Sequence, residues 1–179
     1  DEEGCHWENG DVTTPKGFKD AYDQFCQGGW QGLSHPEEFG GQGLPLSLSI
    51  MKSEMIGTAN WSWGMYPGLS LGAMNTIFIH GTVEQKHHFL PKMVEGTWSG
   101  TMCLTEPQCG TDLGQVKTKA EPLPNGAYAI SGTKIFISGG EQDLTENIIH
   151  LVIARIEGAP EGTKGISLFI VPKVKTARD

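Results

Sequence analysis

The spacing of apolar residues changes along the chain near residue 98. Before that point apolar side chains recur every three or four residues, as on one face of a helix; the first such face carries Phe18, Ala21, Tyr22 and Phe25. After it they alternate with polar ones, as in a strand. The pattern therefore predicts an α+β chain, with an α-helical part at residues 1–98 followed by a part made of short strands, a small barrel or sandwich, at residues 99–179.

In the first part, residues 1–14 read as an extended lead-in. Thr14 is expected to cap a first helix, with Pro15 in its first turn and Gly28 at its end. A glycine-rich loop follows at residues 30–44. Two more helices are expected at 45–61 and 67–79, and a fourth opens at a capping box (Thr82 to Gln85) and is interrupted by Pro91. In the second helix the residues expected to face inward are Leu46, Ile50, Met51 and Met55.

In the second part, short strands are expected near residues 101–104, 116–121, 128–130, 134–137, 148–156 and 166–171. Asn125-Gly126 is a strong signal for a hairpin turn. Strands and helices do not alternate, so a doubly wound parallel sheet is not expected.

Composition narrows the classes of partner. The formal net charge of −8 argues against nucleic acid, and no apolar run approaches the roughly 20 residues that span a bilayer. The acidic, polar start of the chain does not resemble a signal peptide. The four cysteines form no C-x-x-C pair or zinc-like pattern, so we expect them to be reduced in a cytoplasmic protein; they are Cys5, Cys26, Cys103 and Cys109.

Two loops are candidates for ligand binding. The common dinucleotide, triphosphate, hydrolase and zinc motifs are absent, and no metal site is predicted. Residues 104–112 place Thr105 at a strand end, next to a proline and a glycine, and residues 135–140 carry Phe136 and Ser138 before two glycines. A ring and two hydroxyls suit a flat heteroaromatic ligand, with the ring on its face and the hydroxyls at its edge. On pattern alone, an ordinary turn and a core strand remain the alternative.

Four segments together resemble the acyl-CoA dehydrogenase family, in its order and at about its spacing. They are P-E-E-F-G-G-Q-G-L at residues 36–44, G-T-V-E-Q-K with F-L-P at 81–91, L-T-E-P-x-x-G-T-D at 104–112 and G-T-K-I-F-I-S at 132–138. In detail the chain is most similar to the longer bacterial branch of that family that includes 3-methylmercaptopropionyl-CoA dehydrogenase.

The resemblance implies the fold and a cofactor, FAD. The family has a helical domain, a β-barrel domain and a second helical domain, and this chain matches only the first two. The resemblance therefore implies an α+β multidomain protein, with an N-terminal α-helical domain at residues 1–98 and a small antiparallel β-barrel domain at residues 99–179. The C-terminal helical domain, which supplies the catalytic base, is absent from it, so no catalytic residue is assigned and Glu106 is not that base. The residues implied to bind FAD are Met102, Leu104, Thr105, Gly110, Thr111, Phe136, Ile137 and Ser138.

The resemblance implies more specific roles for two of these residues and a difference from the family at a third. Thr105 would place its hydroxyl near flavin N5, and Thr111 would also touch the acyl-CoA substrate. Phe136 stands where the family usually has tryptophan.

The implied reaction is α,β-dehydrogenation of an acyl-CoA thioester, with electrons passed to an electron-transfer flavoprotein by a homodimer or homotetramer. These 179 residues alone are expected to bind FAD weakly and to be inactive. Two alternatives stay open: an acyl-CoA oxidase-like flavoprotein, and a non-catalytic flavin-binding, acyl-CoA-binding or scaffold module on the same fold.

Overall fold

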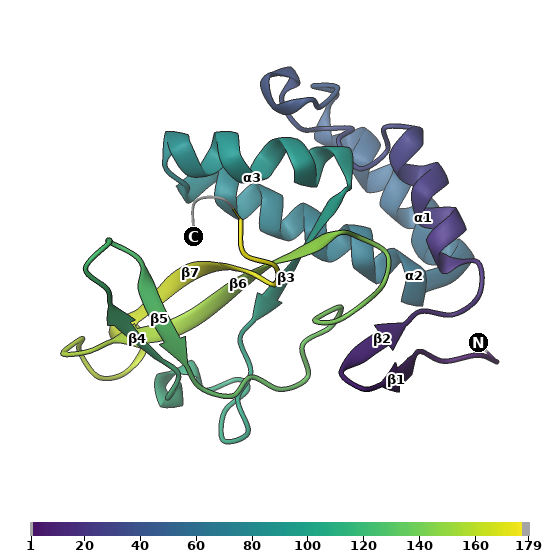
Figure 1. The fold of residues 1–179 in the computed structure, drawn as a ribbon. Helices are drawn as coiled ribbons and strands as arrows, with labels where there is room; N and C mark the ends of the chain where they lie inside the picture. Colours follow the sequence, from purple (N-terminus) through teal and green to yellow (C-terminus); the bar gives the residue numbers. More distant parts are fainter. Residues whose placement is uncertain (1, 177–179) are drawn as a thin grey trace.

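The computed structural model describes residues 2–176. Three α-helices lie above a five-stranded sheet, with a small hairpin at the N-terminal end (Figure 1). The helices are α1 (Phe18–Gln27), α2 (Leu46–His80) and α3 (Val83–Glu95). The hairpin is formed by β1 (His6–Glu8) and β2 (Asp11–Thr13). The sheet is formed by β3 (Trp98–Cys103), β4 (Lys119–Pro122), β5 (Tyr128–Ser131), β6 (Asn147–Ile156) and β7 (Ile166–Pro172).

Helix α1 has the predicted apolar face but not the predicted start. Tyr22 and Phe25 are buried. The residue before the first turn is Gly17, in the left-handed conformation at φ 85°, so the expectation that Thr14 caps the helix is wrong. Thr14 instead donates through its backbone N and its Oγ1 to Asp143 Oδ1, at 3.0 and 2.7 Å. This contact ties the end of the N-terminal hairpin to the segment before β6.

The two helices predicted at 45–61 and 67–79 form one long element, α2, with a single non-helical residue at Asn60. The Asn60 side chain accepts a hydrogen bond from the Trp63 backbone N at 3.0 Å, as a capping residue does at a helix start. The chain therefore kinks at residue 60 and does not form a loop between two helices.

The residues of α2 that were expected to face inward are exposed. Leu46, Ile50, Met51 and Met55 are between 53% and 68% exposed. The side chain that is buried in this half is Ser49, which donates to Ser34 Oγ at 3.0 Å. Helical periodicity identifies a continuous apolar face, but it does not say which face meets the rest of the chain.

Helix α3 begins as predicted and ends later than predicted. The Thr82 side chain accepts from the Gln85 backbone N, and the Gln85 side chain accepts from the Thr82 backbone N, which confirms the capping box. Pro91 lies inside the helix and does not interrupt it. Its neighbours Leu90 and Met93 are fully buried, so packing holds the helix together where proline removes a backbone bond.

The structure confirms the predicted helical part followed by a curled sheet. The strands of the sheet pair in both parallel and antiparallel directions, however, so the prediction of a purely antiparallel sheet is wrong. Strands β3 and β4 both run parallel to β6, opposite residues 147–152 and 155–156. Strands β5 and β7 are antiparallel to β4 and β6, respectively. The overlap of registers on β6 places β3 and β4 along one edge of it and β7 along the other.

The predicted hairpin between β4 and β5 is confirmed, while the strand predicted at 134–137 is not formed. The Leu123 backbone N donates to Ala127 O at 2.8 Å, and Gly126 has a φ of 84°. Beyond β5 the chain is irregular up to β6. Phe136 has a φ of 56°, which is incompatible with an extended strand.

The main apolar core crosses the predicted boundary at residue 98. It combines side chains from α2, α3, β3 and β6: Met74, Ile77, Leu90, Met93, Trp98, Ile149 and Leu151. Gly100 of β3 lies so close to α2 that a Cβ there would overlap the Ala73 side chain. The helices therefore directly support β3, the strand that leads into residues 104–112; the division at residue 98 stays a prediction.

Candidate functional site

The two loops predicted to bind a ligand meet in the structure. The Ile135 backbone N donates to Thr105 O at 3.0 Å, although the two residues are far apart in sequence. The Lys134 Nζ donates to Leu104 O at 3.1 Å. We call residues 104–112 the first loop and residues 135–140 the second loop. Their contact places the residue after β3 directly beside the start of the second loop.

The first loop is organised around the buried carboxylate of Glu106, which is 3% exposed. Five donors surround it: Thr118 Oγ1 at 2.6 Å, the Thr118 backbone N at 3.0 Å, the Lys117 backbone N at 2.8 Å, Lys134 Nζ at 2.9 Å and Gln108 Nε2 at 2.5 Å. A carboxylate with this many donors is held as an anion in one orientation. Glu106 is therefore built to hold the loop and not to exchange protons with a ligand.

The pKa of Glu106 fits this role. Burial alone raises the pKa of a carboxyl group, but the hydrogen bonds from Lys134, Thr118 and the backbone N of Lys117 and Thr118 outweigh it and lower the pKa of Glu106 to about 2. The group is fully ionised at neutral pH, so it does not act as a general base or acid there.

The second loop presents its aromatic ring to solvent. Phe136 is 87% exposed and has a left-handed backbone, which is rare for an aromatic residue. A tight turn follows, in which the Gly140 backbone N donates to Ile137 O at 3.0 Å. On its inner side the turn packs against α2, since a Cβ at Gly139 would lie 3.4 Å from the Tyr66 ring.

The predicted cofactor-binding residues of the first loop differ in how they are placed. Met102 is 38% exposed at the end of β3, and Gly110 lies near the Thr105 methyl group. Leu104 packs inward against a small cluster of Cys109, Val116 and Ile153. Its carbonyl oxygen accepts from Lys134 Nζ, so Leu104 is held by both its side chain and its backbone. The Thr105 hydroxyl makes no hydrogen bond within the described part of the chain.

The remaining predicted residues are Thr111, Ile137 and Ser138. Thr111 and Ser138 are exposed, Ile137 is half-buried, and neither hydroxyl is hydrogen-bonded to another described residue. The bond between Ile135 and Thr105 brings the second loop to the first, but no direct bond joins Ser138 to the first loop among residues 2–176. Binding of a cofactor by these side chains stays a prediction.

Three residues that support the two loops were not predicted from the sequence. Lys134 joins the two loops, and Tyr66 supports the second one. Arg155 donates to the carbonyl oxygens of Val116, Gly114 and Pro160, at 2.7, 2.7 and 3.1 Å, and so fixes the chain that follows the first loop. Lys134 and Arg155 could have been noticed in the sequence, because each is a charged residue beside a run of apolar residues. A charged side chain in such a run is either exposed or paired.

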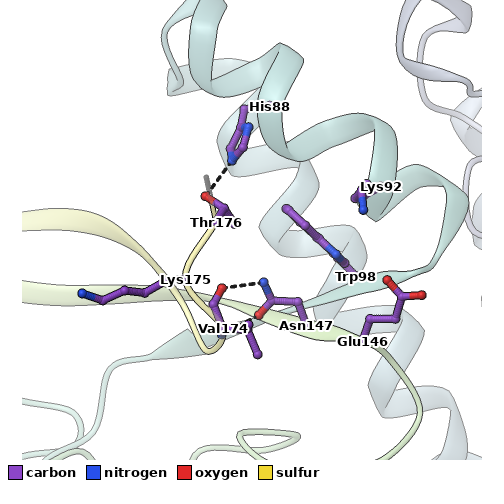
Figure 2. Close-up of a pocket in the computed structure, with 8 residues that line it drawn as sticks. All are labelled: His88, Lys92, Trp98, Glu146, Asn147, Val174, Lys175 and Thr176. Carbon is purple, nitrogen blue, oxygen red and sulfur yellow. Dashed lines mark hydrogen bonds between the residues drawn. The ribbon is translucent and has the colours of Figure 1, made fainter. Parts of the chain in front are cut away.

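A separate pocket of about 360 Å³ lies where α3 meets the end of β7. Figure 2 shows His88 directed from α3 toward Thr176, with the ring Nε2 2.9 Å from the hydroxyl, while Lys175 points away from Lys92. None of the residues in the two loops lines this pocket. It is therefore distinct from the predicted ligand site.

Two further observations concern what the described residues contain. Histidine, cysteine, aspartate and glutamate do not gather anywhere in residues 2–176 into a group that could hold a metal ion. None of the described helices has the length and apolar character needed to cross a membrane.

Comparison with known proteins gives two domain matches. Residues 5–97 match the acyl-CoA dehydrogenase N-terminal domain, and residues 101–178 match the acyl-CoA dehydrogenase middle domain. The chain is 53% identical to 3-methylmercaptopropionyl-CoA dehydrogenase of Ruegeria pomeroyi over 97% of its own length, and it spans 30% of that relative.

Solved structures agree with these matches. An acyl-CoA dehydrogenase of Bacillus anthracis complexed with FAD is 29% identical with a TM-score of 0.73, covering 87% of this chain and 26% of that one. A chain in a structure of the electron transferring flavoprotein of Acidaminococcus fermentans is 31% identical with a TM-score of 0.75, covering 86% of this chain and 39% of that one. The chain belongs to the acyl-CoA dehydrogenase family, and its residues correspond to the N-terminal and middle domains of that family.

Proposed function

We propose that the complete protein is a FAD-dependent acyl-CoA dehydrogenase and that the two loops form one side of its flavin site. The observation that carries this proposal is the direct bond between the Thr105 carbonyl and the Ile135 backbone N. It brings a free hydroxyl, Thr105, to the base of a loop that carries an exposed ring and a second free hydroxyl. FAD, when bound, would supply the redox chemistry as the hydride acceptor, and these residues would hold and orient it.

The residues present fit such a cofactor. A flavin ring system needs an apolar surface for its face and hydrogen-bonding groups for its edge. The exposed Phe136 ring offers the first, and the unbonded hydroxyls of Thr105 and Ser138 offer the second. Because β3 is packed on α2 through Gly100, the first loop is held on a rigid support.

We propose that the described residues bind and orient the cofactor and that the proton-abstracting group lies outside them. Glu106, the carboxylate of the first loop, is buried and ionised, with every donor around it directed inward. We therefore propose that residues 1–179 alone bind FAD weakly and lack dehydrogenase activity. In the complete protein the substrate is an acyl-CoA thioester, in contact with Thr111.

The partners proposed are those of the family. The electron acceptor is an electron-transfer flavoprotein, a class supported by the likeness to the chain from Acidaminococcus fermentans. The complete enzyme is a homodimer or homotetramer, and its location is the cytoplasm. The four free cysteines support that location, since a reducing compartment keeps thiols unpaired.

The test is to purify the protein expressed from its complete gene and to measure flavin absorbance and acyl-CoA oxidation. We expect a yellow protein that reduces a dye acceptor or an electron-transfer flavoprotein faster than it reduces oxygen. Rapid turnover with oxygen alone would favour the oxidase alternative. A folded but colourless protein that does not take up added FAD would contradict the proposal.

Thr105→Val tests the hydroxyl directly, because valine keeps the shape of threonine and removes its donor. Since this hydroxyl has no partner within the described chain, the stability of the FAD-free protein should change by less than about 0.5 kcal/mol. The flavin absorbance band and the rate of flavin reduction should both change, because a hydrogen bond to the ring edge is lost. An unchanged band and rate would remove Thr105 from the site.

A further inference from the structure

The contact between the two loops is concentrated on three consecutive residues. Lys134 Nζ donates to Leu104 O at 3.1 Å and to Glu106 Oε1 at 2.9 Å. The next residue, Ile135, donates its backbone N to Thr105 O at 3.0 Å. Residues 104, 105 and 106 are thus each bonded to residue 134 or 135. Thr105 lies between the two acceptors of one ammonium group, so its position relative to the second loop is fixed on both sides.

This pair of charges is shielded from solvent. The Lys134 side chain is 11% exposed and that of Glu106 is 3% exposed. A buried pair keeps its geometry in salt and resists rotation, because separating it would leave a charge without a partner. Glu106 is in turn fixed by Thr118, which leaves Lys134 as the side chain that connects this fixed carboxylate to the second loop.

We propose that Lys134, acting with Glu106, is a positioning residue that sets the spacing between the Thr105 hydroxyl and the Phe136–Ser138 surface. Its ammonium is directed at the first loop, so it acts through the two loops and not by touching the substrate or the cofactor. This inference rests on the proposed flavin site. It adds to that proposal the residue that fixes the position of the two loops relative to each other.

A matched control exists on α1. Lys19 and Asp23 form an ion pair at 2.6 Å, a distance similar to that of the Lys134–Glu106 pair. The Lys19 and Asp23 side chains are 49% and 47% exposed, and both belong to one helix. An exposed pair of this kind contributes little to stability and connects no two segments. Lys19→Met therefore removes a lysine of the same kind without disturbing the loops.

The experiment compares Lys134→Met, Lys134→Gln, Lys134→Arg and Lys19→Met in the protein expressed from its complete gene. The measurements are the FAD dissociation constant, the shape of the flavin absorbance band and the thermal unfolding of the FAD-free protein. We expect Lys134→Met and Lys134→Gln to bind FAD about ten- to a hundredfold more weakly and to show an altered band. Lys134→Arg, which keeps a cation that can donate to Glu106, should recover most of the affinity, and Lys19→Met should match the wild type.

The outcomes separate this inference from the proposal on which it rests. A wild-type protein that does not bind FAD overturns both. A wild-type protein that binds FAD, together with an unchanged affinity and band in Lys134→Met, overturns only the positioning role. If Lys134→Met does not fold, Lys134→Gln decides, since its amide keeps a polar group in place of the ammonium. A loss of affinity that follows thermal stability in all variants, with no change in the band, shows a purely structural pair and also overturns the inference.

Discussion

The two loops of the candidate site meet at Thr105 and Ile135, yet they are built in opposite ways. The first loop is organised around a buried anion, with five donors directed inward at Glu106. The second loop has no such centre: its ring is exposed, its backbone at Phe136 is in an unfavourable conformation, and a glycine turn closes it. The first loop is a fixed support, whereas the second holds its shape through the contact with the first and with α2.

This contrast predicts where each loop is vulnerable. Changes to Glu106 and to the donors around it should act mainly on folding, because they leave buried polar groups without partners. Changes to the second loop should act mainly on ligand binding, because its side chains are exposed and make few contacts. The three predictions that follow test this division, beginning with the largest expected effect.

The largest effect is expected from acid or from Glu106→Gln. The pKa of Glu106 is lowered from its usual 4.5 to about 2, so its stabilising contribution is complete above about pH 4.5 and is lost as the pH falls through 2. The contribution at neutral pH is about 3 kcal/mol in the free energy of unfolding. Urea unfolding of wild type and Glu106→Gln should therefore differ most at pH 7 and converge near pH 2.

A difference between the two proteins that is the same at pH 7 and pH 3 would contradict this account. It would mean that Glu106 is not ionised within its ring of donors, or that the unfolded protein holds the carboxylate equally well. Glu121→Gln, at an exposed position of β4, is the matched control and should show no such convergence.

A smaller effect is expected from Thr118→Val, which removes one donor from the same carboxylate. The hydroxyl bond of 2.6 Å is lost, while the backbone N of residue 118 still donates to Glu106. Hydrogen bonds to charged groups contribute about 1.5–3 kcal/mol, so the free energy of unfolding should fall by about that amount. Urea unfolding at pH 7 measures it, with Thr133→Val, at an exposed position, as the control. A loss no greater than that of the control would show that the carboxylate is satisfied without this hydroxyl.

The sequence predicted the two loops but not what joins them. A hydroxyl at a strand end, a fixed proline and a glycine are local features, and the resemblance to a known family raised them above an ordinary turn. Lys134 lies in an apolar run that reads as a strand, so its partners could not be inferred from spacing. The backbone at Phe136 lies outside the strand region, and the two residues before it, Lys134 and Ile135, are bonded to the first loop, a tertiary contact that sequence spacing does not reveal.

The same limit applies to α2. Its second half buries Trp63, Met74 and Ile77 against α1, α3 and the sheet. In its first half Ile50 and Met55 were predicted to face inward, yet they are exposed while Ser49 is buried. Periodicity describes the helix itself, whereas burial depends on which segment lies opposite. Local signals such as the Thr82 capping box succeeded because their partners lie within a few residues.

The smallest effect on folding, with the opposite sign, is expected from Phe136→Gly. A left-handed backbone costs an L-residue about 1–2 kcal/mol, and glycine avoids that cost while losing about 0.5–1 kcal/mol through its freedom in the unfolded chain. The ring is 87% exposed, so little packing is lost. The FAD-free protein should therefore unfold at the same denaturant concentration or a slightly higher one.

The affinity of the same variant for FAD should fall, because the exposed ring is removed. Asn9→Gly is the matched control, since Asn9 also has a positive φ, of 53°, but lies in the turn between β1 and β2. Its affinity for FAD should not change. A clear loss of stability in FAD-free Phe136→Gly would mean that the ring holds the second loop in place. The division between the supporting Glu106 network and a binding surface at Phe136 would then fail.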